Sequence, residues 1–411
     1  MVIFSLIFAG EMIFSLPFHV ARFFRPTLLD VFNLTNTELG DIIAVYGIMA
    51  MLAYFPGGAL ADRFSARKLM TFSLLATGLG GFYFAQIPGQ NGLFFLFGYW
   101  GITTIFLFWT AMIKATRDWG GQLSQGKAFG LLDGGRGLVA AGAATLAVLI
   151  LSTFMSETVD STSDAERREA LKTVIYFYTF MTIVAAVFSW TFIAEQQKNE
   201  LRSNPKNTWL GIKTVMRKRV VWLQAVIVVC AYSAYKSLDY YSLYATDVLG
   251  MNEVDAAWFI SNASYLRAVS AIAAGFVVDR FSSNKVIAWL FGGLVFSYLL
   301  LSLSQPNENI PYFIVANIII TFIAVFALRG VYFALLEETK ISGILTGTAV
   351  GLISVIGYTP DAFFNSLAGR ILDASPGLQG HQHFYMLLTV FSIVGLLATF
   401  GLAYTIKQQK N

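Results

Sequence analysis

Long apolar stretches separated by short polar segments run the whole length of the chain. A helix needs about 20 such residues to cross the hydrocarbon core of a bilayer. The stretches that are long enough predict twelve helices, over 3–29, 40–61, 69–87, 91–113, 128–151, 172–194, 220–244, 254–278, 286–304, 311–335, 343–371 and 384–405. The pattern therefore predicts an all-α membrane protein that crosses the bilayer with each of these stretches.

The segments between the stretches alternate in charge along the chain. Lys and Arg concentrate in 62–68, 114–127 and 195–219, whereas 152–172 has mixed charge. The basic segments alternate with segments that are acidic or uncharged, at 30–41, 87–90, 247–255 and 304–310. Because Lys and Arg in short loops favour the cytoplasmic side, we predict that both termini and the segment 195–219 are cytoplasmic.

The segment 195–219 divides the apolar stretches six and six. It contains Asn204-Pro205 and the basic run Arg217-Lys218-Arg219. We predict an N-terminal six-helix bundle over 1–194, a cytoplasmic connector over 195–219 and a C-terminal six-helix bundle over 220–411. The basic run is either part of a solvated linker or a contact for anionic lipid head groups.

Composition supports the membrane class and excludes several others. Hydrophobic residues make up 56% of the chain and charged ones 13%, against about 45–50% and 25% in a soluble domain. The single cysteine, Cys230, excludes an internal disulfide, and no Cys/His cluster suggests a metal. No cofactor is therefore expected. Residues 1–10 lack the basic start and the cleavage site of a signal peptide, so we expect them to stay in the first span.

A short loop sequence occurs twice, after the second and after the eighth apolar stretch. Residues 58–68 and 275–285 agree at six of eleven positions, including the Asp-Arg-Phe-Ser core at Asp62 and at Asp279. Each copy holds the corresponding place in its half of the chain. Duplicated halves are a known architecture of secondary transporters, so the repeat predicts two pseudo-symmetric six-helix bundles.

The first copy of the loop resembles the signature of the major facilitator transporters, Gly-x-Leu-Ala-Asp-Arg followed by basic residues. In that family the Asp caps a neighbouring helix and pairs with Arg to hold the cytoplasmic side shut. The resemblance implies a gating role for Asp62, Arg63 and Arg67, and for Asp279 and Arg280 in the second copy. Ser65 stands where the family usually has Gly.

Charged residues also lie inside the predicted spans, where they are costly and usually functional. They are His19, Arg22, Asp133, Arg136, Lys236, Asp239, Arg267, Arg329 and Asp361. Basic residues outnumber acidic ones in this set, and Arg can bind a carboxylate or a phosphate with two parallel hydrogen bonds. The set therefore favours an anionic substrate.

Structural alternatives remain open for each of these residues. Arg22 either binds substrate or snorkels to an interface, and His19 either carries protons or only packs. Two pairs have the three-residue spacing of an intrahelical ion pair, Asp133 with Arg136 and Lys236 with Asp239, and Arg267 and Arg329 could pair across helices. The tyrosines of the seventh span, Tyr240 among them, form either a site or an interfacial belt.

Within the major facilitator family the chain is most similar to the organophosphate:phosphate antiporters. The similarity rests on Arg22 with the later Glu38-Leu39-Gly40, on Trp109, Lys114 and Trp119, and on Gly343–Gly351 with Gly357-Tyr358. The resemblance implies exchange of a phosphorylated solute for phosphate. The chain departs from the pattern of these antiporters at Phe23, at Lys236, and at Asp133 and Arg136. A phosphorylated substrate is therefore left open, whereas an anionic substrate is still expected.

We therefore expect a transporter, not an enzyme, that moves a small organic anion by alternating access as a monomer. Arg22, Arg136, Lys236 and Tyr240 are the candidate substrate-binding residues. Asp133, Asp239, Asp361 and His19 are the candidate coupling residues. The expected partners are the substrate and membrane lipid, without nucleic acid, in a bacterial inner membrane.

The alternative within transport is a proton-coupled symporter or exporter of neutral or cationic solutes, with an Asp as coupling acid. The fifth span of this chain lacks the Gly-Pro motif of many exporters, since 134–137 reads Gly-Gly-Arg-Gly, and this counts against an exporter. A membrane-embedded hydrolase would need a nucleophile and a base, yet the remaining histidines, His381 and His383, fall in a predicted outer loop.

Overall fold

The computed structural model describes residues 1–121, 125–155, 163–195, 213–305, 311–339 and 343–408. Within those ranges every regular element is a helix. The first half contains α1 (Val2–Met12), η1 (Ser15–His19), α2 (Val20–Phe23), α3 (Arg25–Phe32), α4 (Asn36–Arg63), α5 (Ala66–Phe84), α6 (Gln90–Ile102), η2 (Thr103–Trp109), α7 (Thr110–Gly120), α8 (Gln125–Ser152) and α9 (Asp164–Phe192). The second half contains α11 (Arg219–Ser237), η4 (Leu238–Tyr240), α12 (Tyr241–Asp247), α13 (Glu253–Ser264), α14 (Leu266–Arg280), α15 (Ser283–Leu303), α16 (Pro311–Val331), α17 (Leu335–Glu338), α18 (Gly343–Gly357), α19 (Pro360–Ala374) and α20 (Leu378–Gln408).

Each of the predicted membrane spans coincides with one helix or with consecutive helices, so the all-α prediction is confirmed. In the described residues eight helices are long and apolar enough to cross a membrane, and a bent pair raises the number to nine. Large apolar side chains such as Leu52, Phe72 and Phe95 are 64–76% exposed. An exposed apolar surface of this kind belongs in contact with lipid.

Several spans are broken part-way along their length. The first bends by 43° between Val2–Met12 and Ser15–Phe23, and a π-helix with Pro17 inside it follows the bend. The seventh contains the 3-10 turn η4, the eighth breaks at Tyr265, and the eleventh breaks before Pro360. Proline lacks an N–H and disrupts the helical ladder, which explains the breaks at Pro17 and Pro360.

Contacts between Cα atoms divide the chain into two compact units. The first unit contains 1–198, 239–268 and 361–377, and the second contains 199–238, 269–360 and 378–411. The predicted bundles over 1–194 and 220–411 stay a prediction. The first unit thus contains the first six spans together with the later parts of the seventh and eleventh spans and most of the eighth.

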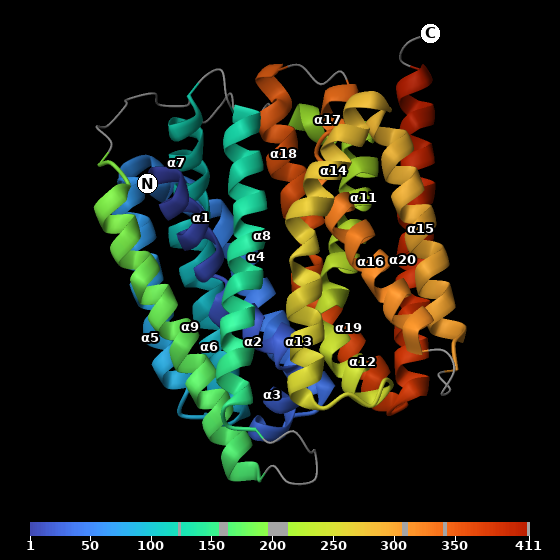
Figure 1. Ribbon diagram of the computed structural model, residues 1–411. Coiled ribbons are helices and arrows are strands. Elements are labelled where there is room, and N and C mark those ends of the chain that lie inside the picture. The colour runs from blue at the N-terminus through green and yellow to red at the C-terminus, as the bar shows by residue number, and fades with distance from the viewer. Residues whose placement is uncertain (122–124, 156–162, 196–212, 306–310, 340–342, 409–411) are drawn as a thin grey trace. The chain divides into compact units, whose positions relative to one another are not determined.

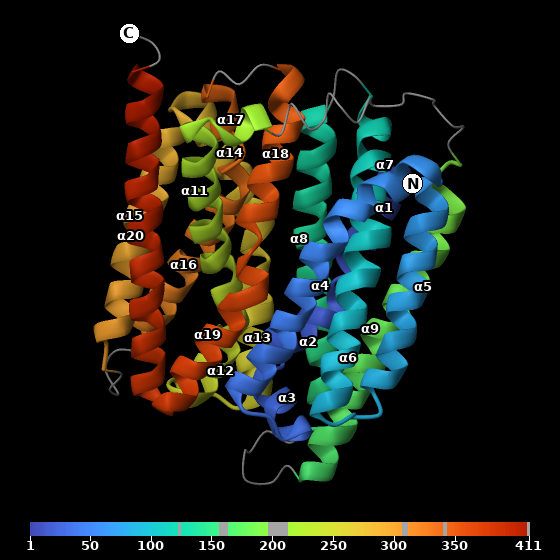
Figure 2. The ribbon, with the colours of Figure 1, turned by 180° about the vertical axis from the view of Figure 1, so that it is seen from behind.

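Long helix pairs build the first unit. α5 packs on α9, α4 on α6, and α8 on both α1 and α13 (Figures 1 and 2). Capping boxes fix two helix starts, at Thr35 with Glu38 before α4 and at Ser163 with Glu166 before α9. Because these starts are fixed, the register of α4 and α9 in the unit is fixed as well.

The second unit is built around α20. α15 and α11 both lie along it, and α11 also packs on α18, while α15 packs on α16 (Figure 1). A Cβ atom at Gly395 of α20 would lie 2.5 Å from the ring of Phe291 on α15. Glycine at that position therefore permits the close approach of α15 and α20.

Candidate functional site

Buried charged side chains of the first unit form what we call the Glu11 network. The Glu11 carboxylate on α1 is only 3% exposed. Its Oε1 lies 3.2 Å from His19 Nε2 and 3.5 Å from one terminal nitrogen of Arg267, and its Oε2 accepts from Arg136 Nε at 3.0 Å. The other terminal nitrogen of Arg267 donates to Asp133 at 2.9 Å. Two carboxylates thus hold two arginines and a histidine.

Local structure explains how these side chains meet. Glu11 and His19 are eight residues apart, and the bend and the π-helix between them separate their two helical segments. Glycines make room for the arginines, since a Cβ at Gly10 would lie 3.3 Å from Arg136 Cδ and one at Gly137 would lie 3.0 Å from Arg267. Small residues at these points therefore let α1, α8 and the start of α14 bring long side chains together.

A second buried pair in the first unit joins Arg22 on α2 to Asp239 in η4. Arg22 Nε donates to Asp239 Oδ1 at 2.5 Å, and the two side chains are 9% and 2% exposed. Ser242 of α12 donates to the Arg22 carbonyl at 3.0 Å. Burial rules out the snorkelling alternative for Arg22, and the pair links positions 217 residues apart.

Arg25 lies next along the chain and is completely buried. Its guanidinium carbon stands 4.0 Å over the ring of Tyr240, and its Nε donates to Asn36 at 3.0 Å. The Tyr240 hydroxyl donates to both the carbonyl and the side-chain oxygen of Asn365, each at 3.1 Å. Tyr240 therefore lies in the interior of the unit, which is not the surroundings of an interfacial belt.

Further hydrogen bonds and ion pairs of the first unit connect α3, α4 and α9 to α13 and α19. Glu253 accepts from Thr27 at 2.5 Å and from Arg167 at 2.9 Å. Arg370 donates to Asp41 at 2.7 Å. Helices that are far apart in the sequence are thus joined within the unit by side chains.

The helices α4 and α19 approach each other closely. A Cβ atom added at Gly40 would lie 2.3 Å from the Asn365 carbonyl, and one at Gly47 would lie 2.3 Å from the Asp361 carbonyl. Asp373 of α19 accepts from the backbone N–H groups that open α4, at 3.2 and 2.7 Å. The seam between α4 and α19 therefore depends on glycine. Asp361, a candidate coupling residue, lies half-buried in this seam.

The second unit contains the predicted Lys236, which is 2% exposed in the last turn of α11. Arg329 on α16 stands 3.9 Å over the ring of Tyr235, also on α11. Arg329 thus makes an aromatic contact across helices, and Arg267 pairs across helices in the first unit.

The repeated loops differ in their contacts. In the first copy Arg67 and Lys68 both pair with Glu195 beyond α9, at 3.0 and 2.5 Å, and Ser65 caps α5 by accepting from the Lys68 N–H. Arg63 is exposed, and the Asp62 side chain lies outside the described residues.

In the second copy of the loop Asp279 and Arg280 are exposed. Glu338 of α17 accepts from the Ser283 N–H at 2.5 Å and from the side chain of Asn284. The helix capping that the family resemblance assigns to the Asp is thus performed in this loop by Glu338. The gating roles of Asp279 and Arg280 stay predictions.

The structure brings together His19, Asp133 and Arg136, as well as Arg22 with Asp239. The spacing of Asp133 and Arg136 suggested a mutual pair, yet each has its hydrogen bond with a residue on another helix. Sequence reasoning missed Glu11. The available signal was one acidic residue inside the apolar run 1–21, and an acid in a span is functional by default.

Sequence reasoning also missed Arg25, which it assigned no role. The available signal was a second arginine three residues after Arg22, at the same end of the first span. Arginines at that spacing share one helix face.

The model of the Major Facilitator Superfamily matches residues 7–359. Inner membrane protein YihN of Escherichia coli K12 is 28% identical over all of this chain and 96% of its own length. Inner membrane protein YqcE of the same strain is 29% identical over 92% of this chain and 89% of its own. The crystal structure of nucleoside transporter NupG superposes with a TM-score of 0.72 at 11% identity, over 97% of this chain and 98% of that one. That likeness shows the fold alone.

Proposed function

Since this chain belongs to the Major Facilitator Superfamily, whose members transport by alternating access, we propose that it carries a small organic anion across the inner membrane. Carboxylates and organophosphates are the candidate classes, and exchange with a second anion is the candidate coupling. Neither bacterial relative has a substrate in its name. The proposal therefore rests on this chain's own residues.

The excess of positive charge in the interior carries the proposal. Among the described residues the buried charged side chains are Arg22, Arg25, Arg136, Lys236 and Arg267 against Glu11 and Asp239. The five cations outnumber the two carboxylates, and the partly exposed Asp133 adds a third carboxylate beside Arg267. Because a guanidinium binds a carboxylate or a phosphate through charge-assisted hydrogen bonds, a mainly basic interior suits an anionic substrate.

Arg22 and Arg136 are the substrate-binding residues best supported by contacts. Each is held by one carboxylate through its Nε, and a guanidinium has five N–H donors in all. A substrate carboxylate or phosphate can therefore replace Asp239 or Glu11 as the partner of these guanidinium groups. Tyr240 would support the neighbouring Arg25, and Lys236 stays a sequence-based candidate.

The first test measures binding and uptake with protein purified in detergent and then reconstituted in liposomes. A panel of organic anions, sugar phosphates and neutral sugars is scored by thermal shift, and hits are tested for uptake with and without counter-substrate inside. We expect that, of the compounds in the panel, only the anions raise the melting temperature of the protein. Arg22→Gln and Arg136→Gln should each raise KM at least about tenfold, the loss expected from a charge-assisted hydrogen bond.

Arg167→Gln is the matched control, because Arg167 is a partly buried arginine whose pair with Glu253 lies outside the Glu11 network. It should keep the wild-type KM. Equal stabilisation by neutral sugars in wild type, Arg22→Gln and Arg136→Gln would show that the two arginines are structural, and the anion proposal would then fail.

One observation favours the alternative of proton-coupled transport of a neutral or cationic solute. Glu11 and His19 share a buried hydrogen bond of 3.2 Å, and a carboxylic acid beside an imidazole can pass a proton. Under this alternative an imposed pH gradient drives uptake, and His19→Gln abolishes the pH dependence while Arg136 and Arg267 keep Glu11 as their partner. Under anion exchange without protons, uptake does not respond to the pH gradient.

A further inference from the structure

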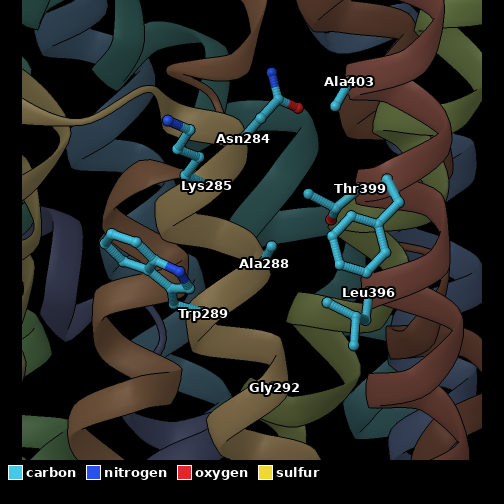
Figure 3. A pocket seen from close by; sticks show the side chains of 9 residues that line it. Asn284, Lys285, Ala288, Trp289, Gly292, Leu396, Thr399 and Ala403 are labelled. Atoms are coloured by element: carbon cyan, nitrogen blue, oxygen red, sulfur yellow. The ribbon is translucent and has the colours of Figure 1, made fainter.

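The second unit has a groove of about 520 Å³ between α15 and α20. Its walls are mainly apolar, with Ala288 and Gly292 on α15 and Leu396 and Ala403 on α20. Figure 3 shows Asn284 and Lys285 at one end of the groove and Gly292 toward the other. A Cβ atom at Gly292 would meet no atom within 4 Å, so the groove is open there.

The end of the groove near Lys285 is polar. Lys285 is exposed in the first turn of α15, and no described acidic side chain lies within ion-pair distance of it. Asn284 is 8% exposed, and its side-chain oxygen has no hydrogen-bond donor among the described residues. Lys407 follows Ala403 by one turn on α20 and is exposed too. The polar end of the groove therefore has an acceptor and one cation in its lining, and Lys407 lies one turn beyond the lining residue Ala403.

The duplicated loop gives an internal comparison. Lys68 in the first copy corresponds to Lys285 in the second, and Lys68 pairs with Glu195 beyond the end of α9 at 2.5 Å. α20 packs on α15 as α9 packs on α5, yet α20 contains no acidic residue and has Lys407 in its last turn. The lysine of the first copy thus has a carboxylate partner, whereas no carboxylate of the described residues pairs with Lys285 in the second copy.

The groove lies at the membrane interface. Lys285 is in the first turn of the span Ser283–Leu303, and Lys407 is in the last turn of the span Leu378–Gln408. From Lys285 to Gly292 the groove extends about 10 Å along α15, about a third of a 30 Å hydrocarbon core. Trp289, 56% exposed beside it, is a residue typical of this depth.

We propose that the groove binds an anionic glycerophospholipid. Its phosphate contacts Lys285 and Lys407, a head-group hydroxyl donates to Asn284, and the upper part of one acyl chain lies along Ala288 and Gly292. Basic pockets between membrane helices are known to recognise lipid head groups in this way. In the orientation predicted from the loop charges, the lipid belongs to the cytoplasmic leaflet.

Native mass spectrometry of the full chain tests the proposal, with an equimolar mixture of phosphatidylglycerol and phosphatidylcholine. We expect retention of phosphatidylglycerol over phosphatidylcholine. Lys285→Gln should reduce that preference about fivefold, which corresponds to about 1 kcal/mol per basic residue at an anionic surface. Lys285→Arg should keep it. Gly292→Leu, which fills the groove, should remove retention of both lipids.

Matched controls come from α8 in the first unit. Lys127→Gln changes another exposed first-turn lysine, and Gly142→Leu fills space at another glycine whose Cβ would meet no atom. Both should retain the lipid preference.

Three results would overturn the proposal. The first is a preference for phosphatidylglycerol over phosphatidylcholine that is unchanged in Lys285→Gln. The second is that free glycerol phosphate stabilises the protein as much as the lipid does. The third is a dimer of the chain that dissociates in Gly292→Leu. The last would show that a second copy of the chain fills the groove.

Discussion

Substitution of Gly47 by alanine should separate α4 from α19 in the first unit. The added Cβ would lie 2.3 Å from the Asp361 carbonyl carbon and oxygen. Unbonded carbon atoms prefer about 3.5–4.0 Å, so one helix must shift by more than about 1 Å. The atoms in the way are backbone atoms of α19, and no side-chain rotation can relieve the collision.

The cost follows from overpacking. Insertion of a methyl group into a well-packed contact costs about 1–3 kcal/mol, and only the conformation in which α4 and α19 touch incurs this cost. A transporter that alternates between conformations can avoid it by leaving the packed state. A difference of that size shifts a two-state equilibrium by about five- to 150-fold.

Cysteine accessibility measures the shift. Cys230 is the only cysteine of the chain, so Cys230→Ser provides a clean background. Ala368 of α19 is 0% exposed and adjoins Gly369, whose added Cβ would lie 2.3 Å from the Asn36 carbonyl of α4. We expect the thiol of Ala368→Cys to be shielded from reagent while α19 keeps this packing. We expect Gly47→Ala to raise its labelling rate about five- to 150-fold, and Gly40→Ala to act in the same direction.

Gly142→Ala is the control, because a Cβ at Gly142 would meet no atom within 4 Å. It should label at the rate of the background protein. If Gly47→Ala and Gly40→Ala both label at the background rate, α4 and α19 absorb the methyl groups locally, and the reasoning from the glycine seam is refuted.

Two further predictions concern ion pairs. Arg22→Gln should cost about 3–5 kcal/mol of stability by leaving the Asp239 carboxylate buried without its arginine, and Arg22→Gln/Asp239→Asn should recover most of that in thermal unfolding; additive losses would contradict it. Hydrogen bonding and charge from Lys68, with the charge of Arg67, lower the pKa of Glu195 below its ordinary value. The ion pairs of Glu195 with Arg67 and Lys68 therefore contribute stability above that ordinary value and lose it as pH falls through the lowered pKa. Because acid itself slows amide exchange, the quantity to measure is the protection factor, which is the intrinsic exchange rate at each pH divided by the observed rate. Acid should lower the protection factors at the start of α5 in wild type but not in Glu195→Gln.

The sequence predicts the spans well because lipid contact imposes one simple requirement on every helix, an apolar surface. Side-chain partners follow a different requirement. The three-residue spacing of Asp133 and Arg136 left a local ion pair open, whereas in the structure Glu11, 125 residues earlier in the chain, accepts from Arg136. Spacing along one helix reports which side chains share a face and says nothing about which helix faces them.

Helix breaks explain where the buried charges of the first unit lie. Glu11 and His19 flank the bend of the first span, Asp239 lies in the 3-10 turn, and Arg267 follows the break at Tyr265 by two residues. A break leaves backbone N–H and C=O groups without their helical partners, and in a membrane such groups are tolerated only in the protein interior or beside a water-filled cavity. Breaks and buried charges therefore need the same polar surroundings, which is why discontinuous helices form the binding sites of many secondary transporters. A proline or a 3-10 turn near a charge inside an apolar stretch is thus a better guide to the site than the charge alone, and in the first span it would have identified Glu11.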